Sequence, residues 1–167
     1  MLQGGDTMTD QTDRDSLKNS LLGQDLEDDE CDILLGIMGE RQLKDGEDLV
    51  TMGDSTRTLF ILVEGKISVI CEVGGNEVQL YSMKIGECAG TRAFVEGAPR
   101  PATLRALRPS SVRTMEPDDF EALLDSHPRV VYKFMRGLFR QTHANLVQVD
   151  CESQQLSNYI NKTGGRY

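Results

Sequence analysis

The sequence predicts a mainly β domain, of the sandwich, barrel or jelly-roll type, with helices before and after the strands. Two observations predict this class. Between Arg41 and Met115, short apolar runs alternate with glycine-containing turns, a spacing typical of many short strands. On either side, apolar residues recur three and four positions apart, which is the period of an α-helix. With 167 residues, the chain is long enough to bury the core of one domain.

Composition and charge exclude several function classes. A net charge of −9 argues against binding nucleic-acid backbones or anionic lipids, because such binding needs lysine and arginine to neutralise phosphate. No apolar run has the length of a membrane span, and residues 1–18 lack the apolar stretch of a signal peptide. We therefore expect a cytoplasmic protein that binds neither DNA nor membranes directly.

Cysteine and histidine are too scattered to indicate a metal centre. The four cysteines, at positions 31, 71, 88 and 151, and the two histidines show no metal-ligand spacing. We expect reduced thiols, no metal and no cofactor. Neither histidine lies beside a recognisable nucleophile, so the sequence also predicts that the protein is not an enzyme.

The N-terminal segments lead into the strands. Residues 1–14 are polar, and we expect a disordered tail there. Asp15-Ser16 predicts a short helix running towards Leu22. A second helix is predicted where the acidic run 24–30 precedes apolar residues spaced three and four apart. Two interpretations of these acids are open: they bind a metal, or they lie on a solvated face, where the helix dipole favours negative charge at the N-terminus. We favour the second.

Five strands can be placed from the apolar pattern. Residues 59–63 and 66–71 flank a turn at Glu64-Gly65, and residues 78–83 return after the hairpin turn Gly74-Gly75-Asn76. Residues 103–107 and 111–115 form a later pair on either side of a proline.

Helical periodicity returns near the C-terminus. A helix is predicted over residues 116–124 and a longer one from Pro128 to residue 149. The long helix carries a stripe at Val131, Met135, Leu138, Thr142, Asn145 and Val149. Two interpretations stay open: the stripe packs on its own domain, or it forms a seam with a second copy in which Asn145 sets the register. Residues 151–167 are expected to be a frayed polar tail, so the predicted domain spans residues 15–150.

The segment from residue 86 to residue 103 carries the candidate chemistry. Gly90 allows the backbone to approach a ligand closely, and residues 91–95 predict a short helix whose free N–H groups converge. Arg100 offers a planar guanidinium fork suited to phosphate. Together they predict a small anion-binding site.

This segment resembles the phosphate-binding cassette of cyclic-nucleotide-binding domains, Phe-Gly-Glu-x-Ala-Leu-Leu-x-Gly-x-Pro-Arg-x-Ala-Thr. Aligned without gaps, the identical positions are Gly90, Ala93, Gly97, Pro99, Arg100, Ala102 and Thr103. Gly53-Asp54 and the strands after it extend the resemblance, which covers residues 24–150. It implies an eight-stranded antiparallel β-roll (jelly roll) with flanking N-terminal and C-terminal (B and C) helices. The implied ligand site comprises Gly90, Thr91, Arg92, Ala93, Arg100, Pro101, Ala102 and Thr103.

Three positions depart from the family pattern. Thr91 occupies the place of the family's glutamate, which takes the ribose 2′-hydroxyl. Losing a hydrogen bond to a charged group, about 1.5–3 kcal/mol, weakens ribose binding about ten- to a hundredfold. Pro101 cannot supply the hydroxyl common in relatives that favour cyclic GMP, so cyclic AMP, weakly held, is the preferred ligand. Arg92 adds charge suited to a more highly charged phosphate, although we favour an orientation towards solvent.

Two functions remain open. The first is a sensor that binds a cyclic nucleotide and signals through its C-terminal helix. The second is a ligand-free, degenerate fold that serves as a dimerisation or protein-docking module. Bacterial regulators with this cassette append a helix-turn-helix domain, whereas 17 residues follow Asp150 here (167 − 150). We therefore expect a stand-alone module without direct DNA binding, which pairs through a homodimer along helix 129–149 or with a partner protein.

Overall fold

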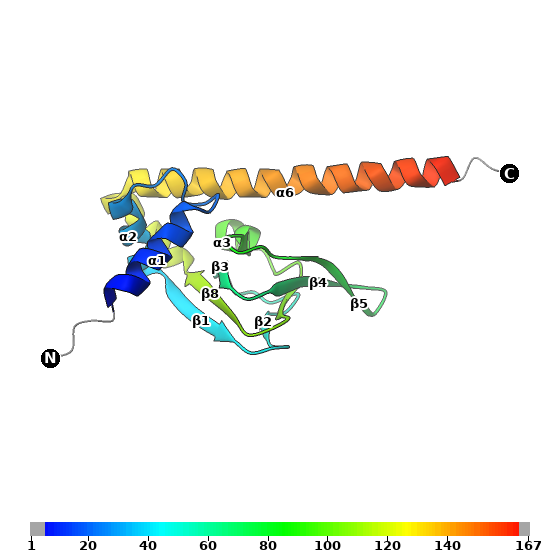
Figure 1. Ribbon diagram of the computed structural model, residues 1–167, viewed down its shortest axis with the longest axis horizontal. Coiled ribbons are helices and arrows are strands. Elements are labelled where there is room, and N and C mark those ends of the chain that lie inside the picture. Colours follow the sequence, from blue (N-terminus) through cyan, green and yellow to red (C-terminus); the bar gives the residue numbers. More distant parts are fainter. Residues whose placement is uncertain (1–5, 164–167) are drawn as a thin grey trace.

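Two four-stranded antiparallel sheets form the centre of the molecule (Figure 1). The computed structural model describes residues 6–163, with side chains described for residues 11–145. The first sheet has the order β1 (Gly39–Leu43), β8 (Ser110–Met115), β3 (Leu59–Glu64), β6 (Cys88–Ala89). The second has the order β2 (Asp48–Val50), β7 (Thr103–Ala106), β4 (Ile67–Val73), β5 (Asn76–Ser82). This arrangement confirms the predicted eight-stranded β-roll.

Helices flank the strands in sequence and in space. The chain begins with α1 (Asp6–Lys18) and α2 (Asp28–Ile37), and α3 (Thr91–Glu96) lies between β6 and β7. After the last strand come α4 (Pro117–Glu121), α5 (Leu123–Ser126) and the 36-residue α6 (Pro128–Thr163). In Figure 1, α6 runs along one side of the molecule and extends beyond the strands.

Two buried clusters hold these layers together. One lies inside the β-roll and includes Leu62, Ile67 and Val112. The other joins the first sheet to the helices, and its members include Leu22, Leu34, Leu59, Met115 and Phe134. Within it, the rings of Phe94, Phe120 and Phe134 form a chain with centroid separations of 5.5 and 5.3 Å. This aromatic chain fixes α3 and α6 relative to each other.

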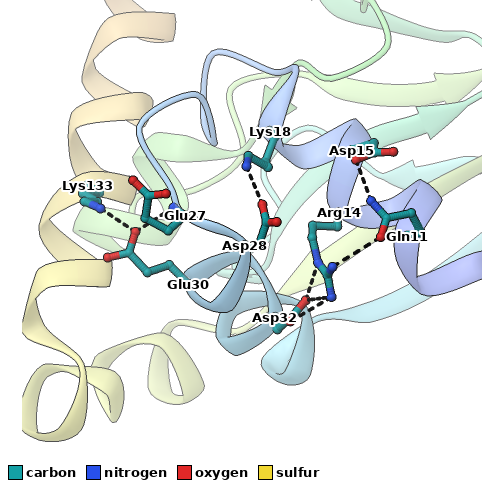
Figure 2. A network of polar contacts seen from close by, with 9 residues as sticks. All are labelled: Gln11, Arg14, Asp15, Lys18, Glu27, Asp28, Glu30, Asp32 and Lys133. Carbon is teal, nitrogen blue, oxygen red and sulfur yellow. Dashed lines mark hydrogen bonds and ion pairs between the residues drawn. The ribbon is translucent and has the colours of Figure 1, made fainter. Parts of the chain in front are cut away.

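The N-terminal helix differs from the prediction. Residues 6–14, expected in a disordered tail, belong to α1, which ends at Lys18 instead of running to Leu22. Arg14 pairs with Asp32 at 2.7 Å, and Lys18 pairs with Asp28, so α1 is tied to α2 (Figure 2). These ion pairs join residues far apart in sequence, which is why composition alone suggested disorder. Residues 1–5 lie outside the described part.

The acidic residues at the start of α2 cap the helix and pair with basic residues of other helices. Glu27 is the N-cap, and its side chain forms a capping box with Glu30, which stabilises the first turn. Asp28 and Asp32 are paired with α1, and Glu30 is paired with Lys133 of α6 (Figure 2). The acids therefore lie at the start of the helix, as the favoured interpretation predicts, but Asp28, Glu30 and Asp32 form ion pairs with other helices instead of lying on a purely solvated face.

The C-terminal helix is longer than predicted. The expected frayed tail is helical as far as Thr163, and residues 151–163 contain neither glycine nor proline, the residues that most disfavour a helix. Residues 164–167, the end of that predicted tail, lie outside the described part. Between residues 6 and 163, no helix combines the length and the apolar character needed to cross a membrane.

The predicted seam on α6 does not coincide with its exposed face. Val131 and Leu138 are buried in the domain's own core. Tyr132 and Phe139 are instead exposed, by 63% and 74%. The side chain of Val149, also assigned to the seam, lies outside the described residues. The stripe therefore packs, over its first half, on its own domain.

Candidate functional site

A cavity of about 940 Å³ lies between the second sheet, α3 and α6. Val50, Val69 and Leu104 contribute apolar side chains from three strands of the sheet. On the opposite side, Met135 and Leu138 of α6 close the wall. The cavity is therefore bounded by three separate parts of the fold.

Six of the eight residues predicted as ligand-binding line this cavity: Gly90, Thr91, Arg92, Arg100, Pro101 and Ala102. The other two do not reach its surface. Ala93 is buried in α3, and the hydroxyl of Thr103 accepts a hydrogen bond from the backbone N–H of Met52 at 3.0 Å. These two positions support the wall rather than form it.

Arg100 is the charged group at the centre of the site, and only 3% of it is exposed. Its Nη2 donates to the carbonyl oxygen of Thr58 at 2.7 Å and to the hydroxyl of Thr56 at 3.3 Å. Its guanidinium carbon lies 5.1 Å from the centroid of the Phe60 ring. Backbone hydrogen bonds with Gly53 and Asp54, both 2.8 Å, hold this residue in place.

Two of the three nitrogens of the Arg100 guanidinium have no hydrogen-bond partner among the described residues. Its Nε and Nη1 are buried without a hydrogen bond from any described residue, and no described carboxylate forms an ion pair with it. Burial lowers the pKa of Arg100, and the charges of Asp54 and Glu116 offset part of this effect. An arginine remains protonated in proteins. The site therefore holds a buried, partly unsatisfied cation, which favours an anion.

Gly90 is required by the position of Arg100. It precedes α3 with a φ of +89°, a left-handed conformation that glycine adopts without penalty. A Cβ at this position would lie 2.0 Å from Arg100 Nη1. The glycine thus leaves free the space into which the unpaired nitrogen points.

The sequence and the fold agree with one family. The family described as "Cyclic nucleotide-binding domain" matches residues 40–127, just over half of the chain. This chain belongs to that family. The structure is similar to a cyclic nucleotide-binding domain from Methylobacillus flagellatus, with a TM-score of 0.77, 20% identity, and coverage of 87% of this chain and 82% of the other.

Regulatory proteins share the fold of this cyclic nucleotide-binding domain. The catabolite activator protein of Thermus thermophilus matches with a TM-score of 0.67 and 24% identity, over 80% of this chain and 63% of that one. The regulatory domain of Toxoplasma gondii PKA, solved with cAMP, matches with a TM-score of 0.65 and 22% identity, over 71% of this chain and 46% of that one. At such identities the similarity establishes the fold alone.

The family's glutamate position is occupied by Thr91, whose surroundings are only weakly polar. Its hydroxyl lies 3.7 Å from the Sγ of Cys88. Burial raises the pKa of the Cys88 thiol to about 11, so this thiol is protonated at neutral pH. Position 91 therefore presents a neutral surface to the cavity.

Arg92 lies at the rim of the cavity. Its side chain is 73% exposed and forms an ion pair with Glu96 at 3.2 Å, one helical turn along α3. This agrees with the favoured orientation towards solvent. An exposed pair of this kind is worth about 0.3–0.5 kcal/mol, so it constrains Arg92 little.

Sequence reasoning missed the contribution of α6 to this site. Met135, Phe139, Thr142 and Asn145 all line the cavity. The apolar stripe of α6 did signal that this face is covered. The three-and-four spacing does not separate contact with a ligand from packing on the domain or a seam with a second copy, because all of them require an apolar face.

Helix α6 is attached to the N-terminal segment beside the cavity. Lys133 pairs with Glu30 (Figure 2), and Arg140 pairs with Asp25 at 2.7 Å. Gly137 faces Leu22 so closely that a Cβ on the glycine would lie 2.4 Å from the Leu22 carbonyl oxygen. These contacts hold positions 133–140 of α6, whereas Thr142 and Asn145 line the cavity beyond them.

Proposed function

We propose that this domain binds a cyclic nucleotide, with cyclic AMP preferred over cyclic GMP, and passes the binding event on through α6. It is a regulatory module with no catalytic role. The ligand's phosphate lies against Arg100 and Gly90, and its base lies along the apolar wall. A single observation carries the proposal: Arg100 is buried in the wall of the cavity, and two of its three guanidinium nitrogens have no partner among the described residues.

The charge pattern supports a compact anion. A buried ion without compensation costs several kcal/mol, so retaining one in a cavity is most easily explained by a ligand that compensates it. A cyclic phosphate diester carries one negative charge and two free oxygens. Such oxygens are acceptors of the kind that the unpaired Nε and Nη1 donors of Arg100 lack.

The rest of the cavity supports a nucleoside. Val50, Val69 and Leu104 offer an apolar surface against which a flat base can pack. Pro101 follows Arg100 and provides neither a hydroxyl nor an N–H group, so it cannot offer the extra hydrogen bond that a guanine would use. This supports the preference for cyclic AMP.

Signalling through α6 follows from the lining of the cavity. Met135, Phe139 and Asn145 belong to α6, so an occupant of the cavity contacts this helix directly. A ligand shifts a conformational equilibrium only through contacts that differ between the two states. The α6 residues are suited to provide that difference.

The experiment is a thermal melt of the purified protein with cyclic AMP, cyclic GMP and AMP. A ligand that binds only the folded state adds about 2.7 kcal/mol of stability at a hundred times its Kd. We expect cyclic AMP to raise the Tm at lower concentration than cyclic GMP, and AMP to have little effect. Absence of any shift at millimolar concentration would contradict the proposal.

Matched arginine variants assign the effect to the site. Arg100→Gln removes the buried cation, whereas Arg108→Gln removes an exposed arginine that donates to the Gly65 carbonyl outside the cavity. We expect only the first to abolish the shift caused by cyclic AMP. Equal shifts in both variants would show that the nucleotide binds elsewhere.

A second function, dimerisation or docking, is favoured by an exposed groove on α6, which shares Met135 and Phe139 with the ligand cavity. Tyr132 and Phe139 are exposed there, 63% and 74%, and they line a groove of about 460 Å³ with Met135, Arg136, Arg140 and His143. Exposed aromatic residues flanked by arginine are typical of protein interfaces. We propose a second copy of this chain as the occupant.

Sedimentation velocity over a range of concentrations tests this association. Tyr132→Asp places a charge in the groove without touching the ligand cavity, and Leu124→Asp changes an apolar residue on α5 that is 53% exposed. We expect the first variant alone to dissociate a dimer. A wild-type protein that stays monomeric at all concentrations would exclude the second copy.

A further inference from the structure

One side chain of α6 forms a polar contact with the strands. Gln141 is only 2% exposed, and its Nε2 donates to the backbone carbonyl oxygen of Cys88 at 3.2 Å. Of the α6 side chains that the structure describes, residues 128–145, it is the only one with a hydrogen bond to the β-roll. Lys133 and Arg140 bond to the N-terminal segment instead. In this part of the chain, the Gln141 amide is therefore the single polar link between α6 and the strands.

The acceptor of this hydrogen bond belongs to an edge strand. β6 lies at the edge of the first sheet, and just before it the carbonyl oxygen of Glu87 accepts from the Leu62 N–H at 3.0 Å. Successive residues of an antiparallel strand direct their backbone groups alternately towards and away from the neighbouring strand, so the Cys88 carbonyl faces away from β3. A buried carbonyl needs a partner, and Gln141 supplies the hydrogen bond that a further strand would otherwise supply.

Gln141 joins two walls of the ligand cavity. Cys88 lines the cavity from β6, two residues before Gly90. Leu138 and Asn145 line it from α6, about one helical turn before and after Gln141. The hydrogen bond between Gln141 and Cys88 therefore fixes the distance between the anion-binding segment and α6.

The amide of Gln141 is poorly suited to a purely stabilising role. Its Oε1 is buried and has no hydrogen-bond partner among the described residues, and an unpaired buried acceptor disfavours the folded state. The neighbouring α6 residues Phe134 and Leu138 belong to the apolar cluster between the helices and the first sheet. A single polar contact in an apolar interface can fix the register of the packed elements. Gln141 thus sets the register of α6 against β6.

We propose that Gln141 is a positioning residue that couples the anion-binding segment to α6. A phosphate held beside Gly90 and Arg100 shifts the β6 segment, and Gln141 passes this shift to α6 through the Cys88 carbonyl. The inference rests on the proposed function. It assigns part of the coupling to a contact within the protein, in addition to the contacts between the ligand and α6.

Hydrogen exchange with and without saturating cyclic AMP compares the wild type with Gln141→Met. Methionine keeps an unbranched side chain but cannot donate to the Cys88 carbonyl. In the wild type we expect cyclic AMP to slow exchange in residues 86–96 and in residues 134–145. In the variant the slowing in 86–96 should remain, whereas that in 134–145 should shrink at least about fivefold, the lower end of typical couplings between sites. Unchanged slowing in both segments would overturn the inference and leave the proposed function intact.

Arg140→Met is the matched control. Arg140 is the adjacent residue of α6, and its guanidinium bonds to the Leu21 carbonyl and to Asp25, away from the β-roll. This variant also loses a polar attachment of α6, so a general loosening of the helix would reduce the slowing in both variants. We expect the control to keep the slowing by cyclic AMP in both segments. An equal loss in Arg140→Met and Gln141→Met would overturn the role of Gln141.

A measurement on the wild type requires no substitution. The side-chain amide of Gln141 gives its own NMR signals, which contacts with neighbouring α6 residues identify. We expect cyclic AMP to shift these signals more than those of Gln42, whose amide donates to Ser111 at 3.1 Å on the opposite edge of the first sheet. Unchanged Gln141 signals at saturating cyclic AMP would overturn the inference alone. Absence of cyclic AMP binding by the wild type would overturn both the inference and the proposed function.

Discussion

The Cα of Gly90 and the guanidinium of Arg100 are so close that a Cβ at position 90 would lie 2.0 Å from Nη1. In Gly90→Ala this nitrogen must therefore move from its place beside Gly90 in the wall of the cavity. A left-handed residue other than glycine also costs about 1–2 kcal/mol. We expect Gly90→Ala to lower the Tm and to abolish the stabilisation by cyclic AMP, both measurable in one melting series.

Gly75→Ala is the control for backbone strain. Gly75 has a φ of +83°, close to the +89° of Gly90, but a Cβ there would meet nothing within 4 Å. Gly75→Ala should lower the Tm about as much as Gly90→Ala does, but it should keep the stabilisation by cyclic AMP. Loss of the response in both variants would mean that strain alone, rather than the displacement of Arg100, disrupts binding.

The buried charge of Arg100 should reduce the stability of the ligand-free domain. Arg100→Met removes a cation whose Nε and Nη1 lack partners and keeps an unbranched side chain beside Phe60. The variant loses the charge-assisted hydrogen bond to the Thr58 carbonyl, worth about 1.5–3 kcal/mol. Burial of the charge costs several kcal/mol, so we expect a net gain of about 1 kcal/mol in urea denaturation.

Arg100→Lys distinguishes the charge from the shape of the side chain. It keeps a buried cation but loses the planar fork, so it should gain no stability and should bind cyclic AMP weakly. A methionine variant that is less stable than the wild type would show instead that the contacts with Thr56 and Thr58 outweigh the burial cost.

Alanine in place of two helical glycines should change the stability of the domain in opposite directions. A Cβ on Gly137 of α6 would lie 2.4 Å from the Leu22 carbonyl oxygen, whereas a Cβ on Gly36 of α2 would meet nothing within 4 Å. We expect Gly137→Ala to destabilise the domain by about 1–3 kcal/mol through overpacking. Gly36→Ala should stabilise it by up to about 1 kcal/mol, because alanine favours helix more than glycine does.

Urea denaturation of both glycine variants checks these opposite signs. The comparison also tests the attachment of α6 to the N-terminal segment. If Gly137→Ala is as stable as the wild type, the backbone contact with Leu22 is not close in solution, and α6 is less firmly held than the structure indicates.

The strands could be predicted where their side chains alternate or are continuously apolar. The residues of β3 and β4 are largely buried, and their apolar runs were visible in the sequence. In contrast, β1 is polar apart from Leu43, and β6 has only two residues. Such short or polar strands are formed by pairing with β8 and β3, a tertiary property that no local pattern contains.

Part of the candidate site could likewise be predicted from the sequence, and part could not. Gly90 and Arg100 belong to one continuous segment, so the sequence alone could place them together. The α6 wall could not be predicted, because packing, dimerisation and ligand contact all require the same apolar spacing. The first part of helix α1 could not be predicted, because ion pairs such as Arg14 with Asp32 stabilise it. These pairs form only when α1 and α2 come together in the folded chain.

The ion pair between Glu30 and Lys133 should make the stability of the domain depend on pH. Burial raises the pKa of Glu30, but the hydrogen bond from the Glu27 N–H and the charge of Lys133 outweigh it, so the pKa lies below the ordinary value of 4.5. A carboxyl group with a lowered folded-state pKa stabilises the protein above its unfolded pKa. This contribution disappears as the pH falls through the folded-state value.

Glu30→Gln isolates this contribution from that of the other carboxylates. At pH 7 we expect it to lower the free energy of unfolding by about 1 kcal/mol, since an amide accepts the Glu27 N–H but does not pair with Lys133. At acid pH, below the folded-state pKa of Glu30, the wild-type carboxyl becomes neutral, and the difference between the two proteins should shrink. Glu121→Gln, exposed on α4, should show little difference at either pH. A deficit in Glu30→Gln that is equally large at both pH values would assign the stabilisation to packing, and α6 would then be held by shape rather than by charge.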